Sequence, residues 1–445
     1  MIGRSRYDLN ASSCFGLDEI SADPSTGGVN LKATMPGPAA WVQWSADPYP
    51  ECALVNDVGL PASPFAAKLS LKTDDAVELL VASSPEDTWI SNDVGLWKDT
   101  DGNPLHAHGG GMHFEDGQYY FVGVGKMAYD QPYFDAYSVT LYRSTDLGEW
   151  TLLSPSILNK SAFINSTFKS PLINAQGPVV LSRPKLIKSA ATGRYILWTG
   201  FMSRGRGTCV ASSDTIDGDY TLESCFMPNK RSLPTCDATV FHDESGEFFL
   251  AADTGSHAYE GISKLSKSGL SVTSADCNTV RCNGSSSCAM FQNKTTAGEA
   301  PALFRSPASG KAYLWTSHLS GWAPNAAMLY EGTTETLCGA MQDFKLLGNP
   351  SLSPTTHNSQ STYIQPVVHA DNSTTLLYMS DRWCNPGFHW GPGGGTCAPN
   401  GNVSNATYLW LPLYPNASAP SGWTLPYLKR WRIGDPRWRI KSNLV

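Results

Sequence analysis

The sequence predicts an all-β protein, a five-bladed β-propeller with an N-terminal β-rich extension. The first observation is composition, because only 16% of the 445 residues are charged, 11% are aromatic, and 40 Gly and 30 Pro are present. Such a profile is typical of short strands joined by many turns. The second observation is that long helical periodicity is absent. The third is a strand pattern that recurs five times after residue 96, and internal repeats outweigh local patterns in predicting a fold.

Residues 1–95 form the first predicted domain, a small β module or packing extension to which the sequence assigns no function. Strands are expected at Lys68–Lys72 and Val77–Val81, where apolar residues alternate or run together. The Pro and Ala residues between Pro61 and Pro64 are typical of a connector.

Residues 96–440 form the second predicted domain. Each repeat begins with a short apolar strand, a polar turn and an aromatic strand, and a third strand follows, as in Val139–Trp150 and Val210–Tyr220. Units of four short strands are typical of propeller blades, whose radial packing hides sheet edges and leaves an axial funnel. A β-sandwich is the alternative. The first halves of the five repeats are Gly111–Val122, Pro184–Trp198, Ala238–Leu250, Ala300–Trp315 and Tyr363–Tyr378.

The basic run Lys429–Arg432, followed by Arg437–Arg439, allows two interpretations of its role. It could contact nucleic acid through charge and stacking, or it could form a closing strand whose cations extend over a hydrophobic seam. We favour the closing strand, because the formal net charge of −7 makes a nucleic-acid partner a poor expectation. No membrane partner is expected either, since no run of about 18 apolar residues occurs.

Eleven cysteines and nine Asn-x-Ser/Thr sites predict a secreted glycoprotein with disulfides. The first twenty residues carry Arg4, Arg6 and Asp8 and no apolar run, so we expect that the start is incomplete or that a leader has been removed. An odd number of cysteines leaves at least one unpaired or bonded outside the chain. The nine sites are Asn10, Asn159, Asn165, Asn283, Asn293, Asn372, Asn402, Asn405 and Asn416.

No cofactor is expected. The crowded Cys277, Cys282 and Cys288 do not have the spacing of a zinc site. A structural calcium ion on the propeller axis stays open as an alternative, although no oxygen-ligand loop of EF-hand type is present. We expect a monomer.

If the five units pack in a ring, the polar residues that lead their first strands converge on one central cavity. Two of these residues are carboxylates, Asp237 and Glu299. Cleavage of a glycosidic bond needs an acid, and an inverting enzyme also needs an opposing group that activates water about 6.5–9.5 Å away. Glu299 is the candidate acid, because Asp237 beside it would disfavour its ionisation and keep a proton available. The structural alternative is a glutamate that caps a strand edge.

An ordered set of motifs now supports a family resemblance. The sequence between about residues 96 and 435 resembles glycoside hydrolase family 43, and within it the exo-β-1,3-galactanase branch. The motifs that carry the resemblance are Trp97–Gly111, Ser182–Lys185, Glu299–Pro301, Gly321–Asn325, Gly348–Pro350, Ser359–Thr362 and Met379–Trp383.

The resemblance implies a five-bladed propeller that acts on a polysaccharide, β-1,3-galactan of the arabinogalactan type, and releases sugar from the non-reducing end with inversion. It implies that Glu299 is the general acid and that Asp237 orients the substrate and modulates the acid. Gln360 matches a glutamine that takes the place of the general base, the usual Asp of the first blade being absent. Because a neutral amide is a poor base in water, we expect Gln360 to position the nucleophilic water.

Six further residues are candidates for binding the sugar. Trp322 and Tyr133 are candidate aromatic platforms for a galactose ring, and Arg183 is expected to pair with a funnel carboxylate and keep Asp237 ionised. The other three lie in or beside the matching motifs and are Ser182, His108 and Asn325.

Two departures from the branch bear on activity. The branch usually has glutamate at the positions of Ser182 and Val124, and both glutamates are expected to contact the terminal sugar. A lost charge-assisted hydrogen bond costs about 1.5–3 kcal/mol. Two alternatives therefore stand beside the galactanase: a glycan-binding propeller with weak or no hydrolysis, and a family 43 enzyme that acts on arabinose or xylose.

Overall fold

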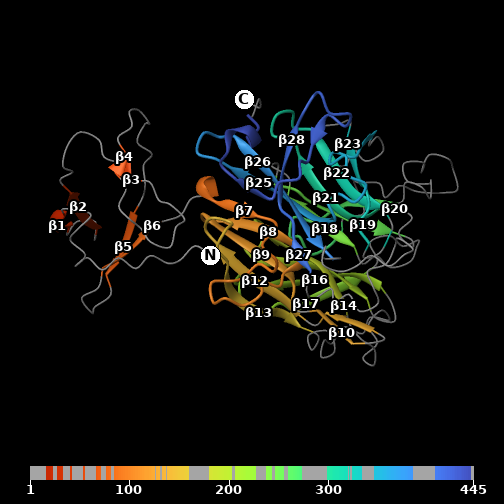
Figure 1. Ribbon diagram of the computed structural model, residues 1–445. Coiled ribbons are helices and arrows are strands. Elements are labelled where there is room, and N and C mark those ends of the chain that lie inside the picture. The colour runs from red at the N-terminus through yellow and green to blue at the C-terminus, as the bar shows by residue number, and fades with distance from the viewer. Residues whose placement is uncertain are drawn as a thin grey trace. The chain divides into compact units, whose positions relative to one another are not determined.

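The chain divides into two compact units, Met1–Ser84 and Pro85–Val445, in the computed structural model (Figure 1). The predicted boundary at residue 95 stays a prediction, and residues 85–95 already supply a strand to the second unit. The structure describes residues 17–23, 28–33, 41–42, 54–55, 67–71, 77–81, 85–125, 127–130, 133–136, 138–159, 180–202, 206–226, 237–242, 246–254, 259–272, 298–318, 320, 323–332, 345–383 and 406–441.

The first unit consists, in its described part, of three antiparallel strand pairs. The last of them spans the two segments that alternate or run apolar in the sequence, so the strands expected at Lys68–Lys72 and Val77–Val81 are confirmed. The pairs are β1 (Leu17–Asp23) with β2 (Gly28–Ala33), β3 (Trp41–Val42) with β4 (Leu54–Val55), and β5 (Ala67–Leu71) with β6 (Val77–Val81).

The described part of the second unit contains five blade sheets in which consecutive strands pair antiparallel, as predicted for propeller blades. Blade 1 comprises β8 (His108–Glu115), β9 (Gln118–Val124), β12 (Ser138–Ser144) and β13 (Thr151–Asn159). Blade 2 comprises β14 (Val180–Lys188), β15 (Tyr195–Met202), β16 (Arg206–Ser213) and β17 (Thr221–Phe226). The hairpin of β10 (Met127–Asp130) and β11 (Tyr133–Ala136) joins blade 2 through a parallel pairing to β14.

The remaining blades follow in chain order. Blade 3 shows three described strands, β18 (Ala238–His242), β19 (Phe248–Thr254) and β20 (Tyr259–Lys264). Blade 4 comprises β21 (Gly298–Arg305), β22 (Ala312–His318), β23 (Ala327–Glu331) and β24 (Lys345–Gly348). Blade 5 comprises β25 (Gln360–Val368), β26 (Thr374–Arg382), β28 (Leu411–Pro415) and β29 (Trp423–Thr424), with β27 (Thr407–Tyr408) also paired to β26.

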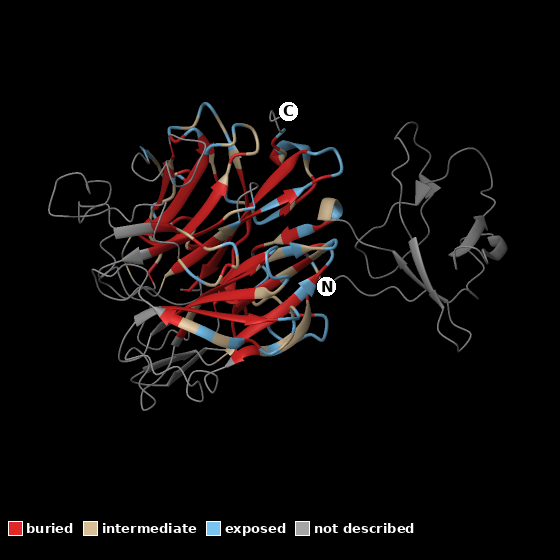
Figure 2. Ribbon diagram, turned by 180° about the vertical axis from the view of Figure 1, so that it is seen from behind, coloured by how far each residue is buried: buried red, intermediate tan, exposed pale blue. Residues whose placement is uncertain are grey.

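The first strands of the five blades form a closed ring. β8 neighbours β14, and β14, β18, β21 and β25 follow in sequence until β25 returns to β8. The hydrophobic core is divided accordingly into five clusters, each lying between two adjacent blades. Figure 2 shows this burial concentrated along the blade strands and exposure along their connecting turns. A β-sandwich would have one core between two sheets, so the ring confirms the propeller.

The ring is closed by strands from the two ends of the second unit. β7 (Trp89–Ser91) pairs antiparallel with β30 (Arg430–Arg432), and one-turn 3-10 helices, η1 (Pro85–Asp87) and η4 (Pro436–Trp438), flank them. Trp431 is buried in the seam, whereas the guanidinium of Arg430 lies 4.5 Å from the ring centre of Trp89. The basic C-terminal run is therefore a closing strand with outward cations, as favoured from the sequence.

The side chain of Asn92 links this pair of strands to the chain around Trp410 and Leu428. Its buried amide donates to the carbonyls of Trp410 and Leu428, both at 2.9 Å, and accepts from the Trp410 amide at 2.9 Å. Replacement by alanine is expected to lower the free energy of unfolding by about 1–3 kcal/mol, because the buried Trp410 amide loses its partner, whereas the Trp410 carbonyl keeps the Trp431 indole at 2.8 Å. Denaturant unfolding measures the effect, with the exposed Asn103→Ala as a matched control; equal stability of both variants would contradict it.

Candidate active site

The first strands of four blades carry the same irregularity near their start. The register shifts directly after the leading residues in β8, β14, β21 and β25, as a β-bulge does. In three of them the residue at the bulge has a left-handed φ, namely 61° at Gly109, 47° at Arg183 and 59° at Ala300. A non-glycine residue in this region costs of order 1–3 kcal/mol and persists only where its surroundings hold it. The bulges turn the side chains beside them away from the regular strand alternation.

Glu299 and Gln360 lie side by side at the starts of β21 and β25. The Gln360 Nε2 group donates to Glu299 Oε1 at 3.0 Å and to Ser317 Oγ at 3.1 Å. Glu299 is 7% exposed, so it is largely buried but not closed off from solvent. The structure thus places Gln360 in direct contact with the candidate acid, closer than the distance of about 6.5–9.5 Å that separates the two groups of an inverting site.

Arg183 connects these two residues to Asp237. Its Nε atom lies 2.8 Å from Asp237 Oδ1, so the predicted ion pair is present, and its Nη2 donates to Gln360 Oε1 at 2.7 Å. The second oxygen of Asp237 accepts from the Ala300 amide at 3.0 Å, next to Glu299. Burial works against the charge of Arg183, but the carboxylates of Asp237 and Glu299 raise its pKa above the ordinary value. The guanidinium therefore stays charged.

His108 lies behind this network and is fully buried. Its Nδ1 is 3.2 Å from Asp381 Oδ1, its Nε2 is 3.4 Å from His106 Nδ1, and its ring stacks on Tyr408 at 5.4 Å. The second oxygen of Asp381 accepts from the Gly109 amide at 2.6 Å. Both ring nitrogens of His108 are thus engaged by protein groups, which fits a supporting role better than the direct sugar contact expected from sequence.

The glycines after His108 allow close approach both within blade 1 and between blades 1 and 2. A Cβ on Gly110 would lie 2.1 Å from the Val122 carbonyl, and one on Gly111 would lie 2.5 Å from Cδ of Lys185. The buried Lys185 reaches across this gap and donates to the Gly109 carbonyl at 2.8 Å. Burial lowers the pKa of Lys185 well below its ordinary value, and the charge of Arg183 lowers it further. The glycine run therefore makes room for cross-blade contacts.

The other residues predicted for the site differ in where the structure places them. The Asn325 amide is used within its own loop, where it accepts from the His318 amide and donates to the His318 carbonyl. Val124 is 0% exposed and belongs to the core cluster between blades 1 and 2. Trp322 lies outside the described residues, and Tyr133 falls in β11 with its side chain outside the described part.

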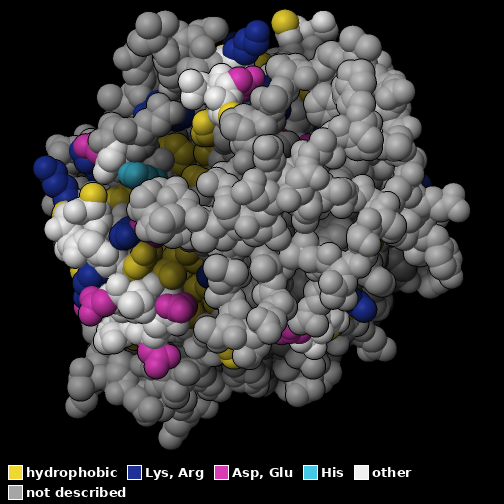
Figure 3. All heavy atoms as spheres, turned by 90° about the vertical axis from the view of Figure 1, so that its left-hand side faces the viewer, with side chains coloured by type: hydrophobic (Ala, Val, Ile, Leu, Met, Phe, Trp, Pro, Cys, Tyr) yellow, Lys and Arg dark blue, Asp and Glu magenta, His cyan; other side chains and the backbone are white. Residues whose placement is uncertain are grey.

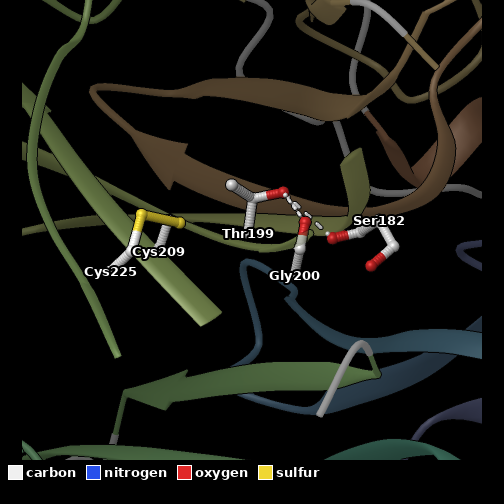
Figure 4. Close-up of a disulfide and its surroundings, with 5 residues drawn as sticks. All are labelled: Ser182, Thr199, Gly200, Cys209 and Cys225. Atoms are coloured by element: carbon white, nitrogen blue, oxygen red, sulfur yellow. Dashed lines mark hydrogen bonds between the residues drawn. A yellow bond between two sulfur atoms is a disulfide. The ribbon is translucent and has the colours of Figure 1, made fainter. Parts of the chain in front are cut away.

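Ser182 lies half-buried on β14, and the Thr199 hydroxyl donates to its carbonyl at 3.0 Å. Figure 4 shows this contact beside the disulfide between Cys209 and Cys225, which joins the neighbouring strands β16 and β17 of the same blade. The cysteine count predicted disulfides but not this pairing.

Two contact residues of the network were not identified as such from the sequence, namely Trp383 and Ser317. The Trp383 indole donates to Gln360 Oε1 at 2.8 Å. Trp383 closes the motif Met379–Trp383, so its place in that motif was the available signal. Ser317 gave none, because it lies inside β22 and meets Gln360 only through the packing of two blades.

The described residues hold no group of three or more His, Cys, Asp or Glu side chains that could bind a metal ion. The same residues include no helix that is long and apolar enough to cross a membrane. On the face seen in Figure 3, visible acidic and basic side chains are interspersed, which agrees with the modest net charge of −7.

The five-bladed propeller thus holds a largely buried glutamate, an aspartate paired with arginine, and a glutamine between the glutamate and the arginine, which are the parts expected from the sequence for a glycoside hydrolase site. No family model matches the sequence, and no curated protein matches it in sequence comparison. Solved structures do match. An exo-β-1,3-galactanase from Clostridium thermocellum is 28% identical with a TM-score of 0.59, and the match covers 80% of this chain and 68% of that one.

Two further structures agree in fold. A β-1,3-galactosidase of glycoside hydrolase family 43, solved with galactodeoxynojirimycin, is 23% identical with a TM-score of 0.59, covering 77% of this chain and all of that one. An exo-β-1,3-galactanase from Phanerochaete chrysosporium, solved with β-1,3-galactotriose, is 23% identical with a TM-score of 0.57, covering 78% of this chain and 68% of that one. The fold of this chain is thus similar to those of exo-β-1,3-galactanases and of a family 43 β-1,3-galactosidase, which confirms the resemblance found in its motifs.

Proposed function

We propose that this protein is a glycoside hydrolase that releases galactose from the non-reducing end of β-1,3-galactan with inversion. One observation carries the proposal: Glu299, Gln360 and Asp237 belong to one hydrogen-bonded network at the start of the inner strands, joined by Arg183. Its support from outside the chain is the likeness to a 28% identical exo-β-1,3-galactanase.

In the proposed reaction Glu299 donates a proton to the glycosidic oxygen as the bond to the sugar breaks. Asp237 accepts a hydrogen bond from the Ala300 amide and thereby holds the backbone beside the acid in place. Water attacks the sugar from the face opposite the leaving group and loses a proton to the solvent, from which Glu299 is reprotonated, so a β-linked galactose leaves with the α configuration. General acid assistance of this kind contributes about 10²–10⁴-fold to the rate.

The direct test incubates the protein with β-1,3-galactan and, separately, with β-1,4-galactan, arabinan and xylan, and follows the products by proton NMR. Release of α-galactose from β-1,3-galactan alone is expected. Initial β-galactose would refute inversion, and arabinose or xylose would favour the alternative that the enzyme acts on another sugar.

A glycan-binding propeller with weak or no hydrolysis is the second candidate, because Ser182 stands where the galactanase branch has glutamate. The Ser182→Glu variant distinguishes the two. If the protein is an attenuated enzyme, the new carboxylate is expected to raise turnover at least tenfold, since a charge-assisted hydrogen bond to the sugar is worth about 1.5–3 kcal/mol. Ser182→Gln is the matched control, with similar shape and no charge. Galactan binding measured by calorimetry, without turnover in any variant, would favour the binding module.

We propose further that the protein acts outside the cell as a monomeric glycoprotein. The disulfide between Cys209 and Cys225 supports an oxidising compartment. Asn372 supports glycosylation, because it is exposed in the turn between β25 and β26 and is followed by Ser373 and Thr374. Secreted protein from a eukaryotic host is expected to carry glycan at Asn372, detectable by peptide mass mapping, and light scattering tests the monomer.

A further inference from the structure

The side-chain amide of Gln360 has all of its hydrogen-bonding capacity in use. An amide oxygen accepts two hydrogen bonds and an amide nitrogen donates two. Both acceptor positions of Gln360 Oε1 are filled, by Arg183 Nη2 at 2.7 Å and Trp383 Nε1 at 2.8 Å. Both N–H groups are also used, toward Glu299 Oε1 at 3.0 Å and Ser317 Oγ at 3.1 Å. Gln360 therefore cannot hold a water molecule without giving up one of these partners.

The chemistry of the partners allows one orientation of this amide. A guanidinium and an indole N–H donate and cannot accept, so Arg183 and Trp383 require the oxygen of Gln360 to face them. The NH2 group must then face Glu299. The usual ambiguity between the oxygen and nitrogen of a glutamine amide does not arise here.

This orientation decides where Glu299 can carry its proton. An N–H group points at Oε1, and a proton on that oxygen would meet it head on. The carbonyl oxygen of a carboxylic acid is a better acceptor than its hydroxyl oxygen, so this contact favours Oε1 as the carbonyl oxygen and Oε2 as the oxygen that carries the transferable proton. Gln360 is then a group that orients the acid, beyond any contact with water.

We infer that Trp383 is a positioning residue that, together with Arg183, locks the Gln360 amide and so confines the transferable proton of Glu299 to Oε2. The inference rests on the proposed hydrolase function. Trp383 suits the role because it is buried directly after β26, on which Asp381 pairs in register with Gln360. Its ring lies 5.9 Å from that of His108, which Asp381 in turn holds. These contacts hold the indole ring of Trp383 in place.

Kinetics of Trp383→Phe test the lock, because phenylalanine keeps a buried ring and removes the N–H. We expect kcat on β-1,3-galactan to fall at least tenfold while KM changes less than threefold. Trp198→Phe is the matched control: the Trp198 indole, also buried, donates to the Gly269 carbonyl at 2.8 Å in another part of blade 2. It is expected to lower stability and leave kcat unchanged.

A double-mutant cycle separates positioning from a general structural role. If Trp383 acts through Gln360, adding Trp383→Phe to Gln360→Ala is expected to lower kcat less than twofold further. Equal losses in both backgrounds would overturn the inference.

A measurement that needs no turnover separates this inference from the proposed function. In protein labelled with 15N-glutamine, the Gln360 side-chain signal is assigned by its loss in Gln360→Ala. We expect its protons to exchange at least tenfold more slowly than those of free glutamine, and at least tenfold faster in Trp383→Phe. Its nitrogen shift should titrate with pH in the parent protein and not in Glu299→Gln.

Fast exchange in the parent protein, or a shift independent of pH, refutes the lock even if Trp383→Phe does not fold or Gln360→Ala has no measurable turnover. Slow exchange and a titrating shift in a protein that cleaves no galactan would instead refute the hydrolase function and leave the lock standing.

Discussion

Glu299→Gln is expected to reduce the release of galactose from β-1,3-galactan by about 10²–10⁴-fold, the contribution typical of a general acid. Glutamine has no acidic proton to donate to the leaving oxygen. Its amide oxygen can still accept from Gln360 Nε2, so the network that surrounds position 299 should persist. Reducing-sugar release measures the effect, and circular dichroism with denaturant unfolding verifies that the fold is retained.

The leaving group supplies a control for this variant. An aryl β-galactoside whose phenol leaves without protonation is expected to be cleaved by Glu299→Gln with a much smaller loss than galactan. Glu331→Gln is the matched substitution, because Glu331 pairs with Lys311 at the exposed outer part of blade 4 and should leave turnover unchanged. Full galactanase activity in Glu299→Gln would remove this residue from the mechanism.

The propeller could be predicted because its information is repeated along the chain. The sequence of each blade has the same pattern of apolar strand, turn and aromatic strand. The five blades form a ring whose first strands lie around one axis. That geometry brought Asp237 and Glu299 into consideration together, and the family resemblance added Gln360. The closing strand could also be predicted from the sequence, because the alternation of Arg430, Trp431 and Arg432 places one apolar side chain inward and two cations outward.

The finer parts of the site depend on packing between blades, which no local pattern encodes. Arg183 and Ala300 have a left-handed φ at bulges that side-chain contacts hold in place. Neither residue type favours a positive φ, so the sequence does not predict it. Ser317 meets Gln360 across the boundary between blades 4 and 5, and Trp383 reaches it from the end of the second strand of blade 5. Resemblance marked the motif that contains Trp383 but gave the residue no role.

Asp237→Asn is the second variant expected to have a large effect. Asp237 accepts two donors at once, Arg183 Nε on Oδ1 and the Ala300 amide on Oδ2. Asparagine has one acceptor oxygen and one NH2 group, so it can satisfy only one of these donors and must turn N–H toward the other. It also leaves the Arg183 charge, only 5% exposed, without its carboxylate partner. We expect the free energy of unfolding to fall by about 3–5 kcal/mol, as when one partner of a buried ion pair is removed.

The same substitution should lower kcat more than it raises KM, because the Ala300 amide that Asp237 holds lies next to the acid, whereas the sugar contacts proposed for Ser182 stay in place. Asp214→Asn is the matched control: Asp214 also pairs with an arginine Nε at 2.9 Å, that of Arg194, but its side chain is 87% exposed. An exposed pair contributes about 0–1 kcal/mol, so this variant should match the parent in stability and turnover. If Asp237→Asn were as stable and as active as Asp214→Asn, the pairing of Arg183 with Asp237 would not be what organises the site.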